Sequence, residues 1–257
     1  MRRVAFYVND AKPGAEAKRA ALAAELSEYG LVETDGADAE IVIALGGDGT
    51  ILRAVHEFPG RPVLGLNLGG LGYLSAVGER EAEKALALLA GGCYTIAARA
   101  LLEVRGHLAL NDIAFIRELS GHAAELDLFI DGRPVTHYLA DGLVFATPTG
   151  STAYSLSAGG PVLLPDSADF VVTPMNPHAL GVRPLVVRDD VRFAVAVRQR
   201  TDGNRMNVGV YADGENVMTL SPGEQVEIAK AAQTAKLVEL EGYDPYDVLA
   251  HKLGWCR

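Results

Sequence analysis

Cysteine is scarce in this sequence of 257 residues, which contains only Cys93 and Cys256. The two lie far apart along the chain, so the sequence predicts neither a disulfide framework nor a thiolate metal cluster. Of the six histidines, His56, His107, His122, His137 and His251 show no metal-ligand spacing, and a structural role is favoured for His178. These residue types therefore leave the position of any metal ligand unknown.

Long apolar runs are absent as well. No run approaches the roughly 20 residues that a membrane-spanning helix requires. The N-terminal segment, MRRVAFYVND, turns polar too early for a signal peptide. We therefore expect a cytoplasmic protein without a membrane partner.

Basic residues are fewer than acidic ones, since 23 Lys and Arg against 33 Asp and Glu give a net charge of −10. Nucleic acids and anionic membranes are bound by basic faces, so this balance argues against both partners. A polyanionic ligand would have to be attracted locally, by backbone amides, a few basic side chains or a divalent cation.

Apolar residues, in contrast, make up 49% of the chain, which is enough for the cores of two domains. Strands and helices alternate in the first part of the sequence, and this order predicts a Rossmann-like parallel sheet covered by helices. Strands are expected at 3–8, 41–45 and 62–67, and helices at 15–29, 51–58 and 79–90.

From about residue 96 the helical periodicity fades, and short β-branched runs alternate with turn residues. Asp-Gly dipeptides at 131–132 and 213–214 lie between apolar runs and predict β-hairpins. We expect an antiparallel β-sandwich-like domain, with a partly open barrel as the alternative. Its strands are expected at 126–130, 134–138, 143–147, 170–173, 191–197, 208–211, 217–220 and 225–229. The fold class is thus a two-domain α/β plus all-β protein, with domains at 1–95 and 96–235. The tail 236–257, with a short helix at 247–253, is expected to pack back on the first domain.

A glycine-rich turn, Gly46-Gly47-Asp48-Gly49-Thr50, follows the strand expected at 41–45. Glycines let backbone amides approach an anion, and Asp48 would point into the same space. This combination indicates phosphate chemistry with a base nearby. The same residues also suit a tight strand-to-helix turn with Asp48 or Thr50 as the helix cap, and the pentapeptide alone does not separate the two interpretations.

A second glycine-rich loop, residues 68–74, follows the strand expected at 62–67. Ligands of open α/β sheets collect at this edge. Taken alone, the loop is better interpreted as a flexible connection in which Tyr73 and Leu74 fill the core.

The stretch from Thr147 to Pro161 carries seven hydroxyl side chains and three glycines in fifteen residues. Such a composition is not that of a core, and it predicts an ordered loop that enters a helix N-terminus and faces a polar ligand. A serine-rich surface turn is the alternative.

Asn111 and Asp112 form a polar pair between apolar strand residues. The pair either caps a β-turn or hydrogen-bonds a ligand at the mouth of a strand.

Together these motifs resemble the NAD kinase family, whose members phosphorylate the 2′-hydroxyl of the adenosine ribose of NAD to give NADP. The resemblance rests on 46–50, on 65–67 with 71–74, on 111–112 and above all on 141–161, in the family's order. It implies a phosphotransferase that uses NAD, Mg2+ and either ATP or inorganic polyphosphate. It also implies a homodimer or homotetramer.

The resemblance assigns roles to individual residues. Asp48 would be the catalytic base that takes the proton of the ribose hydroxyl, while positioning and electrostatic stabilisation supply most of the acceleration. The β-rich domain would bind NAD. The implied substrate- and nucleotide-binding residues are Gly46, Gly47, Gly49, Thr50, Tyr73, Asn111, Asp112, Asp141, Thr149, Thr152, Ala153, Tyr154 and Ser157.

Two positions depart from the family's usual pattern. Asp112 stands where the family usually has Glu, and the shorter side chain requires either a closer backbone or a weaker hydrogen bond. Tyr73 stands where the family has Phe and keeps the ring for stacking.

Two rival functions share part of this evidence. Lipid and sphingosine kinases have the 46–50 element, but the acidic charge and the 147–161 stretch do not favour them. A regulatory protein that only senses NAD would not need the carboxylate of Asp48.

Overall fold

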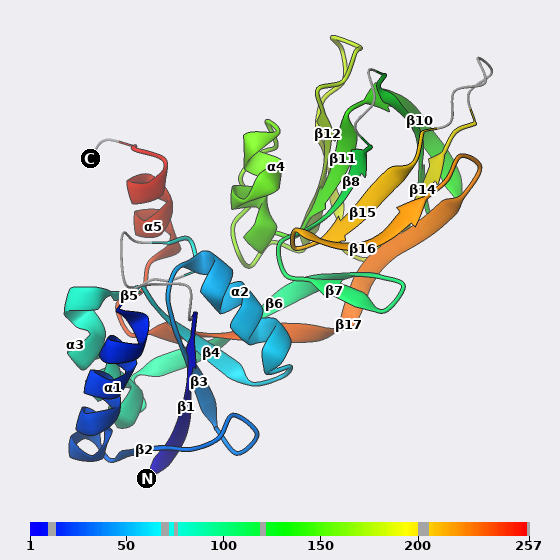
Figure 1. Ribbon diagram of the computed structural model, residues 1–257. Helices are drawn as coiled ribbons and strands as arrows, with labels where there is room; N and C mark the ends of the chain where they lie inside the picture. Colours follow the sequence, from blue (N-terminus) through cyan, green and yellow to red (C-terminus); the bar gives the residue numbers. More distant parts are fainter. Residues whose placement is uncertain (10–13, 68–71, 75–76, 119–121, 200–205, 256–257) are drawn as a thin grey trace. The chain divides into compact units, whose positions relative to one another are not determined.

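The computed structural model describes residues 1–9, 14–67, 72–74, 77–118, 122–199 and 206–255. The chain divides into two compact units, of which unit 1 comprises residues 1–99 and 234–257 and unit 2 comprises residues 100–233 (Figure 1). Two long strands, β6 (Tyr94–Val104) and β17 (Gln225–Leu240), contribute residues to both units. Within the described ranges, no helix has the length and apolar character needed to cross a membrane.

Unit 1 is built on a parallel sheet in the order β2-β1-β3-β4-β17, which confirms the predicted Rossmann-like arrangement. The short strand β5 pairs with the end of β4, also in parallel. The strands are β1 (Arg2–Val8), β2 (Leu31–Glu33), β3 (Ile41–Leu45), β4 (Pro62–Asn67) and β5 (Val77–Gly78).

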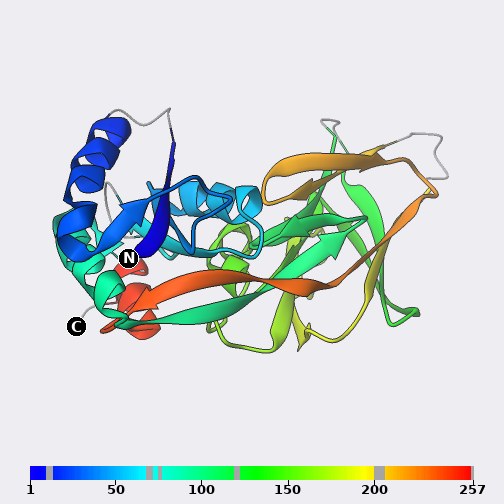
Figure 2. The ribbon, with the colours of Figure 1, turned by 90° about the horizontal axis from the view of Figure 1, so that it is seen from below.

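Strand β3 is buried at every position, as a strand at the centre of a covered parallel sheet should be. Leu22 of α1 and Leu86 of α3 share a core with Ile43 of β3, and Figure 2 shows these two helices side by side. The helices of unit 1 are α1 (Ala15–Glu25), η1 (Leu26–Tyr29), α2 (Asp48–Glu57), η2 (Glu79–Glu81), α3 (Ala82–Gly91) and α5 (Pro245–Lys252).

Unit 2 contains two antiparallel sheets, ordered β13-β12-β11-β8-β15-β16 and β10-β9-β14-β17. Phe115 (β8) and Phe145 (β11) come from the first sheet and Phe193 (β14) from the second. The ring centroid of Phe145 lies 5.6 Å from that of Phe115 and 5.1 Å from that of Phe193. The shared aromatic core confirms the sandwich-like prediction.

The remaining elements of unit 2 are short. They are β7 (His107–Ala109), β8 (Asp112–Arg117), β9 (Ala124–Ile130), β10 (Arg133–Ala140), β11 (Gly142–Ala146), η3 (Thr149–Thr152), α4 (Tyr154–Ser157), β12 (Asp169–Met175), β13 (Leu185–Arg188), β14 (Phe193–Val197), β15 (Val208–Ala212) and β16 (Glu215–Leu220).

Both predicted Asp-Gly hairpins are confirmed, between β9 and β10 and between β15 and β16. Asp213 has a φ of 49° and Gly214 a φ of 86°, the left-handed pair that a two-residue type I′ turn requires.

Most predicted boundaries differ from the structure by one or two residues, and those of α2 and β17 differ by more. Helix α2 begins at Asp48 and not at Ile51, because the glycine turn leads directly into helical backbone. The strand predicted at 225–229 continues to Leu240 as β17, since its second half pairs with β4 of unit 1.

Candidate active site

The first cluster of predicted residues lies where β3 ends in unit 1. Gly46 donates its N–H to Leu66 O at 2.9 Å, so this amide belongs to the sheet. Its φ is 157°, and a Cβ at this position would lie 2.2 Å from Oγ1 of Thr50. Gly46 must therefore be glycine for the chain to turn. Thr50 is buried beneath it, with 2% of its surface exposed.

Gly47 caps helix α2 with an extended backbone, and Asp48 is the acidic residue of the first turn. A carboxylate at this position interacts favourably with the helix dipole. Gly49 follows on the exposed side of the turn, where an added Cβ would meet nothing within 4 Å. The turn thus combines an obligatory glycine, a half-buried carboxylate and open space.

The carboxylate of Asp48 is held by the loop that follows β4. Its Oδ2 accepts the N–H of Tyr73 at 2.8 Å, and its Oδ1 accepts the N–H of Leu74 at 3.0 Å. Burial and the charge of Asp48 raise the pKa of the Tyr73 hydroxyl. Lys252 of α5 places its Nζ 5.6 Å from the Tyr73 ring centroid. Of the predicted second glycine loop, residues 68–71 lie outside the described part of the chain.

The second cluster lies in unit 2, around the start of β8. The carboxylate of Asp213 accepts backbone N–H groups from Leu110 at 2.7 Å, Asn111 at 2.7 Å and Asp112 at 3.2 Å. The backbone N–H of Asp213 returns a bond to Asp112 O at 3.0 Å. A hairpin turn thereby fixes the backbone of the Asn111-Asp112 pair.

Asp112 is a buried carboxyl group, with 5% of its surface exposed. Burial, followed by the charge of Asp213, raises its pKa from 3.8 to about 7, and a hydrogen bond from the backbone of Tyr154 opposes this shift. Asp112 therefore changes its protonation state close to neutral pH.

The hydroxyl-rich stretch is tied to the same pair. Thr147 donates its N–H to Asn111 O at 2.9 Å and its hydroxyl to Leu110 O at 2.5 Å. A Cβ on Gly150 would lie 1.9 Å from Asn111 O, so only glycine fits there. The stretch forms the 3-10 turn η3 and the four-residue helix α4.

Several of these hydroxyls bond within the protein. Ser151 donates to Pro148 O at 2.7 Å, Thr152 donates to Thr149 O at 3.1 Å, and Ser155 bonds the hydroxyl of Thr173 at 2.8 Å. The exposed members of the stretch include Tyr154 and Ser157. Burial, and then the charges of Asp112 and Asp141, raise the pKa of Tyr154.

Asp141 lies at the opposite end of β11 from Asp112. Register places Gly142 beside Ile116 and Ala146 beside Asp112. Asp141 accepts hydrogen bonds from Arg117 Nε at 2.6 Å and Asn176 Nδ2 at 3.0 Å. The Arg117 bond is the main reason why the pKa of Asp141 is lowered.

Both clusters lie in parts of the chain that match models of known protein domains. The model of the ATP-NAD kinase N-terminal domain matches residues 8–94, and that of the ATP-NAD kinase C-terminal domain matches residues 110–240. The chain belongs to the NAD kinase family.

Two members of the NAD kinase family show how much of the chain is similar. The NAD kinase of Symbiobacterium thermophilum is 41% identical over 227 residues, which cover 84% of this chain and 79% of the relative. The NAD kinase of Carboxydothermus hydrogenoformans is 37% identical over 242 residues, which cover 88% of this chain and 85% of the relative.

Two solved structures have a similar fold. Yeast NADH kinase complexed with NADH superposes with a TM-score of 0.89 at 26% identity, over 99% of this chain and 88% of that chain. An NAD kinase from Archaeoglobus fulgidus in complex with ATP superposes with a TM-score of 0.79 at 25% identity, over 99% of this chain and all of that one (100%).

The residues predicted from the NAD kinase motifs thus fall into one group in each unit. Gly46, Gly47, Asp48, Gly49, Thr50 and Tyr73 form the group of unit 1. Asn111, Asp112, Thr149, Thr152, Ala153, Tyr154 and Ser157 form the group of unit 2. Asp141 lies at the opposite end of β11 from Asp112, where its charge still acts on Tyr154.

Sequence reasoning missed Asp213, which it assigned only to a hairpin turn. The turn assignment is confirmed. The Asp213 carboxylate, however, also accepts the backbone N–H groups of Leu110, Asn111 and Asp112, which lie about a hundred residues earlier in the chain. Aspartate, rather than asparagine, at the first turn position was the available signal, since a carboxylate accepts several donors at once.

Proposed function

We propose that this chain is a phosphotransferase that moves the γ-phosphate of ATP to the 2′-hydroxyl of the adenosine ribose of NAD, forming NADP. The observation that carries this proposal is the carboxylate of Asp48, held at a glycine turn between a buried strand and a helix N-terminus. Both domains of the NAD kinase family are matched in the same chain.

Asp48 is proposed as the general base. It would accept the proton of the ribose hydroxyl while the oxygen attacks the γ-phosphorus. The N–H groups of Tyr73 and Leu74 orient its carboxylate, and the N-terminus of α2 is suited to negative charge. A positioned base contributes about 10²–10⁴-fold to the rate.

Gly47 and Gly49 are proposed to lie against phosphate groups, because the Gly46 amide already bonds Leu66 O. Thr50 supports this turn from below, as its burial indicates. Close approach of phosphates would require the open space that surrounds Gly49.

The unit 2 cluster is proposed to bind the dinucleotide. Asn111 and Asp112 would hydrogen-bond the nucleoside. The remainder of NAD would contact Tyr154 and the neighbouring residues Thr149, Thr152, Ala153 and Ser157. Asp141 and Tyr73 complete the proposed set. The fixed backbone at 110–112 supports this assignment, because a preorganised segment loses less entropy on binding.

ATP is the proposed donor, and inorganic polyphosphate is the alternative. The related Archaeoglobus fulgidus enzyme was solved with ATP, and the yeast relative was solved with NADH. Among the described residues no group of three or more His, Cys, Asp or Glu side chains converges. We propose that Mg2+ arrives with the phosphates of ATP, as this ion commonly does, and neutralises their charge.

The enzyme is further proposed to act in the cytoplasm as a homodimer or homotetramer. Closed symmetric assemblies are the usual form of soluble oligomers. Light scattering coupled to gel filtration would measure the subunit number.

The direct test is to incubate the purified protein with NAD, ATP and Mg2+ and to detect NADP with an NADP-dependent dehydrogenase. Parallel reactions should replace ATP by polyphosphate and NAD by NADH. NADP formation with ATP or polyphosphate is expected. Binding of NAD without any product from either donor would instead indicate a sensor and would refute the proposed activity.

A further inference from the structure

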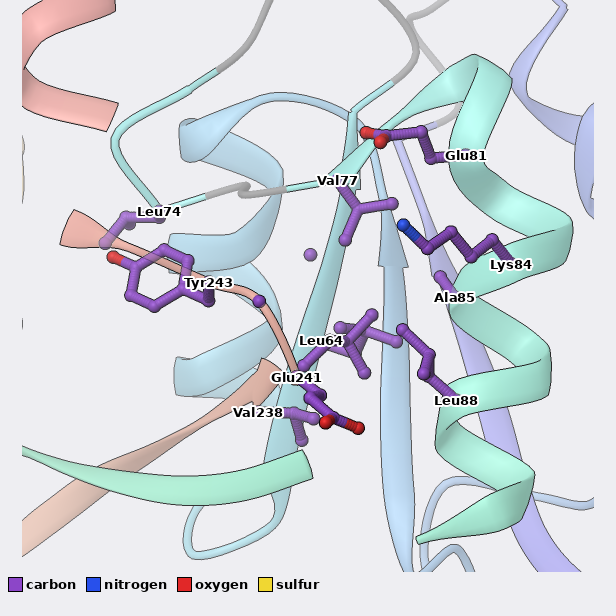
Figure 3. A pocket seen from close by; sticks show the side chains of 13 residues that line it. Leu64, Leu74, Val77, Glu81, Lys84, Ala85, Leu88, Val238, Glu241 and Tyr243 are labelled. Atoms are coloured by element: carbon purple, nitrogen blue, oxygen red, sulfur yellow. The ribbon is translucent and has the colours of Figure 1, made fainter. Parts of the chain in front are cut away.

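A cavity of about 140 Å³ lies within unit 1, between α3, the edge of β4 and the end of β17 (Figure 3). It forms where the neighbour of β4 changes. Residues 62–63 of β4 pair with β17, and residues 66–67 pair with β5. Leu64 and Gly65, which lie between these two pairings, line the cavity.

The walls of this cavity combine apolar and polar surface. The apolar side chains are Leu64, Leu74, Val77, Ala85, Leu88, Val238 and Leu240, and the polar ones are Glu81, Lys84, Glu241 and Tyr243. Apolar protein cavities of about 150 Å³ are known to admit benzene. The available volume therefore suits one aromatic ring or a short branched alkyl group.

One cationic side chain, that of the exposed residue Lys84, lines the cavity together with the carboxylates of Glu81 and Glu241. Figure 3 shows the ammonium group of Lys84 extending from α3 toward Val77 and the cavity. Within the described part of the chain, no hydrogen bond or ion pair engages the Lys84 side chain. The neighbouring carboxylate of Glu81 accepts the N–H of Gly78 at 3.5 Å. The ammonium group is thus available to an anion.

The cavity also reaches the loop that holds Asp48. Leu74 lines it and donates its N–H to Asp48 Oδ1 at 3.0 Å. On its other side, Gly242 and Tyr243 line the cavity and lead into α5. That helix places Lys252 over the ring of Tyr73. A bound molecule would therefore contact Leu74, which holds Asp48 directly, and the segment that leads to Lys252 above Tyr73.

We propose that this cavity binds a small apolar monocarboxylate, with the carboxylate on Lys84 and the apolar body among Leu64, Leu88 and Val238. We further propose that occupancy changes the backbone at Tyr73 and Leu74 and thereby regulates phosphoryl transfer. The regulatory part rests on the proposed function, whereas binding itself does not.

Benzoate is the probe for the binding test, with benzyl alcohol and benzylamine as neutral and cationic analogues of the same size. Titration calorimetry is performed on the full chain without NAD or ATP. Benzoate is expected to bind with a Kd on the order of 1 mM, as befits a ligand of about nine heavy atoms. Either analogue binding as tightly as benzoate, or no binding of benzoate, would overturn the proposal.

Three variants locate the site. Lys84→Ala is expected to weaken benzoate binding about threefold, because the ion pair is partly exposed. Lys84→Arg should retain the affinity. Lys236→Ala removes an exposed lysine of unit 1 that does not line the cavity, so it should bind as the wild type does. Equal affinity of Lys84→Ala and the wild type would refute the role of Lys84.

The coupling is tested by the amide resonances of Tyr73 and Leu74 during the same titration. The chemical shifts of both amides should change with benzoate concentration, and the fitted Kd should equal the one measured by calorimetry. The kcat for NADP formation should change over the same concentrations. Resonances that stay in place while benzoate binds would refute the coupling. A protein that binds benzoate and shifts these amides but makes no NADP would refute the proposed function alone.

Discussion

Asp48 in unit 1 and Asp112 in unit 2 are proposed to serve the same reaction, yet their surroundings differ. Asp48 is half-buried, lies at a helix N-terminus and accepts two backbone N–H groups. Asp112 is buried beside a second carboxylate, and its pKa is raised to about 7. The helix N-terminus and the two N–H donors stabilise negative charge on the Asp48 carboxylate. Burial beside Asp213, in contrast, favours the protonated form of Asp112.

The largest expected effect tests the first setting. Asp48→Asn keeps the shape of the side chain but removes the base, so kcat should fall by about 10²–10⁴-fold. NAD should still bind, which calorimetry can measure. Asp38→Asn, at an exposed position of unit 1, is the matched control and should keep wild-type activity. Wild-type turnover in Asp48→Asn would remove Asp48 from the proposed role.

The second setting is tested by the pH dependence of stability. The folded protein holds the Asp112 proton more tightly than the unfolded chain does, because the pKa rises from 3.8 to about 7. Asp112 should therefore stabilise the folded protein most below pH 4. Its contribution to the free energy of unfolding should fall by about 2–4 kcal/mol as the pH rises to 7.

Urea unfolding at several pH values measures this loss. Asp112→Asn should abolish it. Asp213→Asn should move it to lower pH, because the second cause of the raised pKa is the charge of Asp213. A wild-type profile in Asp112→Asn would show that another group titrates.

Gly49 of unit 1 and Gly150 of unit 2 differ in the space that surrounds them. Gly150→Ala would place a Cβ 1.9 Å from Asn111 O, whereas Gly49→Ala meets nothing within 4 Å. Gly150→Ala should lower the free energy of unfolding by about 2–4 kcal/mol. Gly49→Ala should be neutral or stabilising, as Ala is in a helix.

Thermal and urea unfolding compare the two variants. If Gly49 lies against phosphate, Gly49→Ala should raise KM for ATP without loss of stability. An unchanged KM would count against the phosphate role of Gly49, and equal stability of both variants would contradict the packing at Gly150.

The smallest expected effect concerns the loop that holds Asp48. Lys252→Ala removes the cation over Tyr73, a contact worth about 0.5–1 kcal/mol at an exposed site. A correspondingly small drop in the free energy of unfolding is expected. Lys236→Ala serves as the control, and an equal drop in both variants would show that the Tyr73 contact contributes nothing.

The sequence by itself determined the local elements and the family. The buried run at 41–45, the Asp-Gly turns at 131–132 and 213–214 and the hydroxyl-rich stretch at 147–161 each carry their signal within a few residues. Such signals depend on periodicity and turn chemistry, which are local properties of the chain. The parallel sheet and the antiparallel sandwich followed from them.

Only the tertiary structure decided which groups meet. The Asp213 carboxylate reaches amides at 110–112, and the amides of Tyr73 and Leu74 reach Asp48. The raised pKa of Asp112 likewise depends on its burial and on Asp213. Contacts between distant segments, and the dielectric environment they create, depend on how strands pair and pack. A local sequence pattern does not contain that information, because burial and charge proximity arise only when the chain is folded.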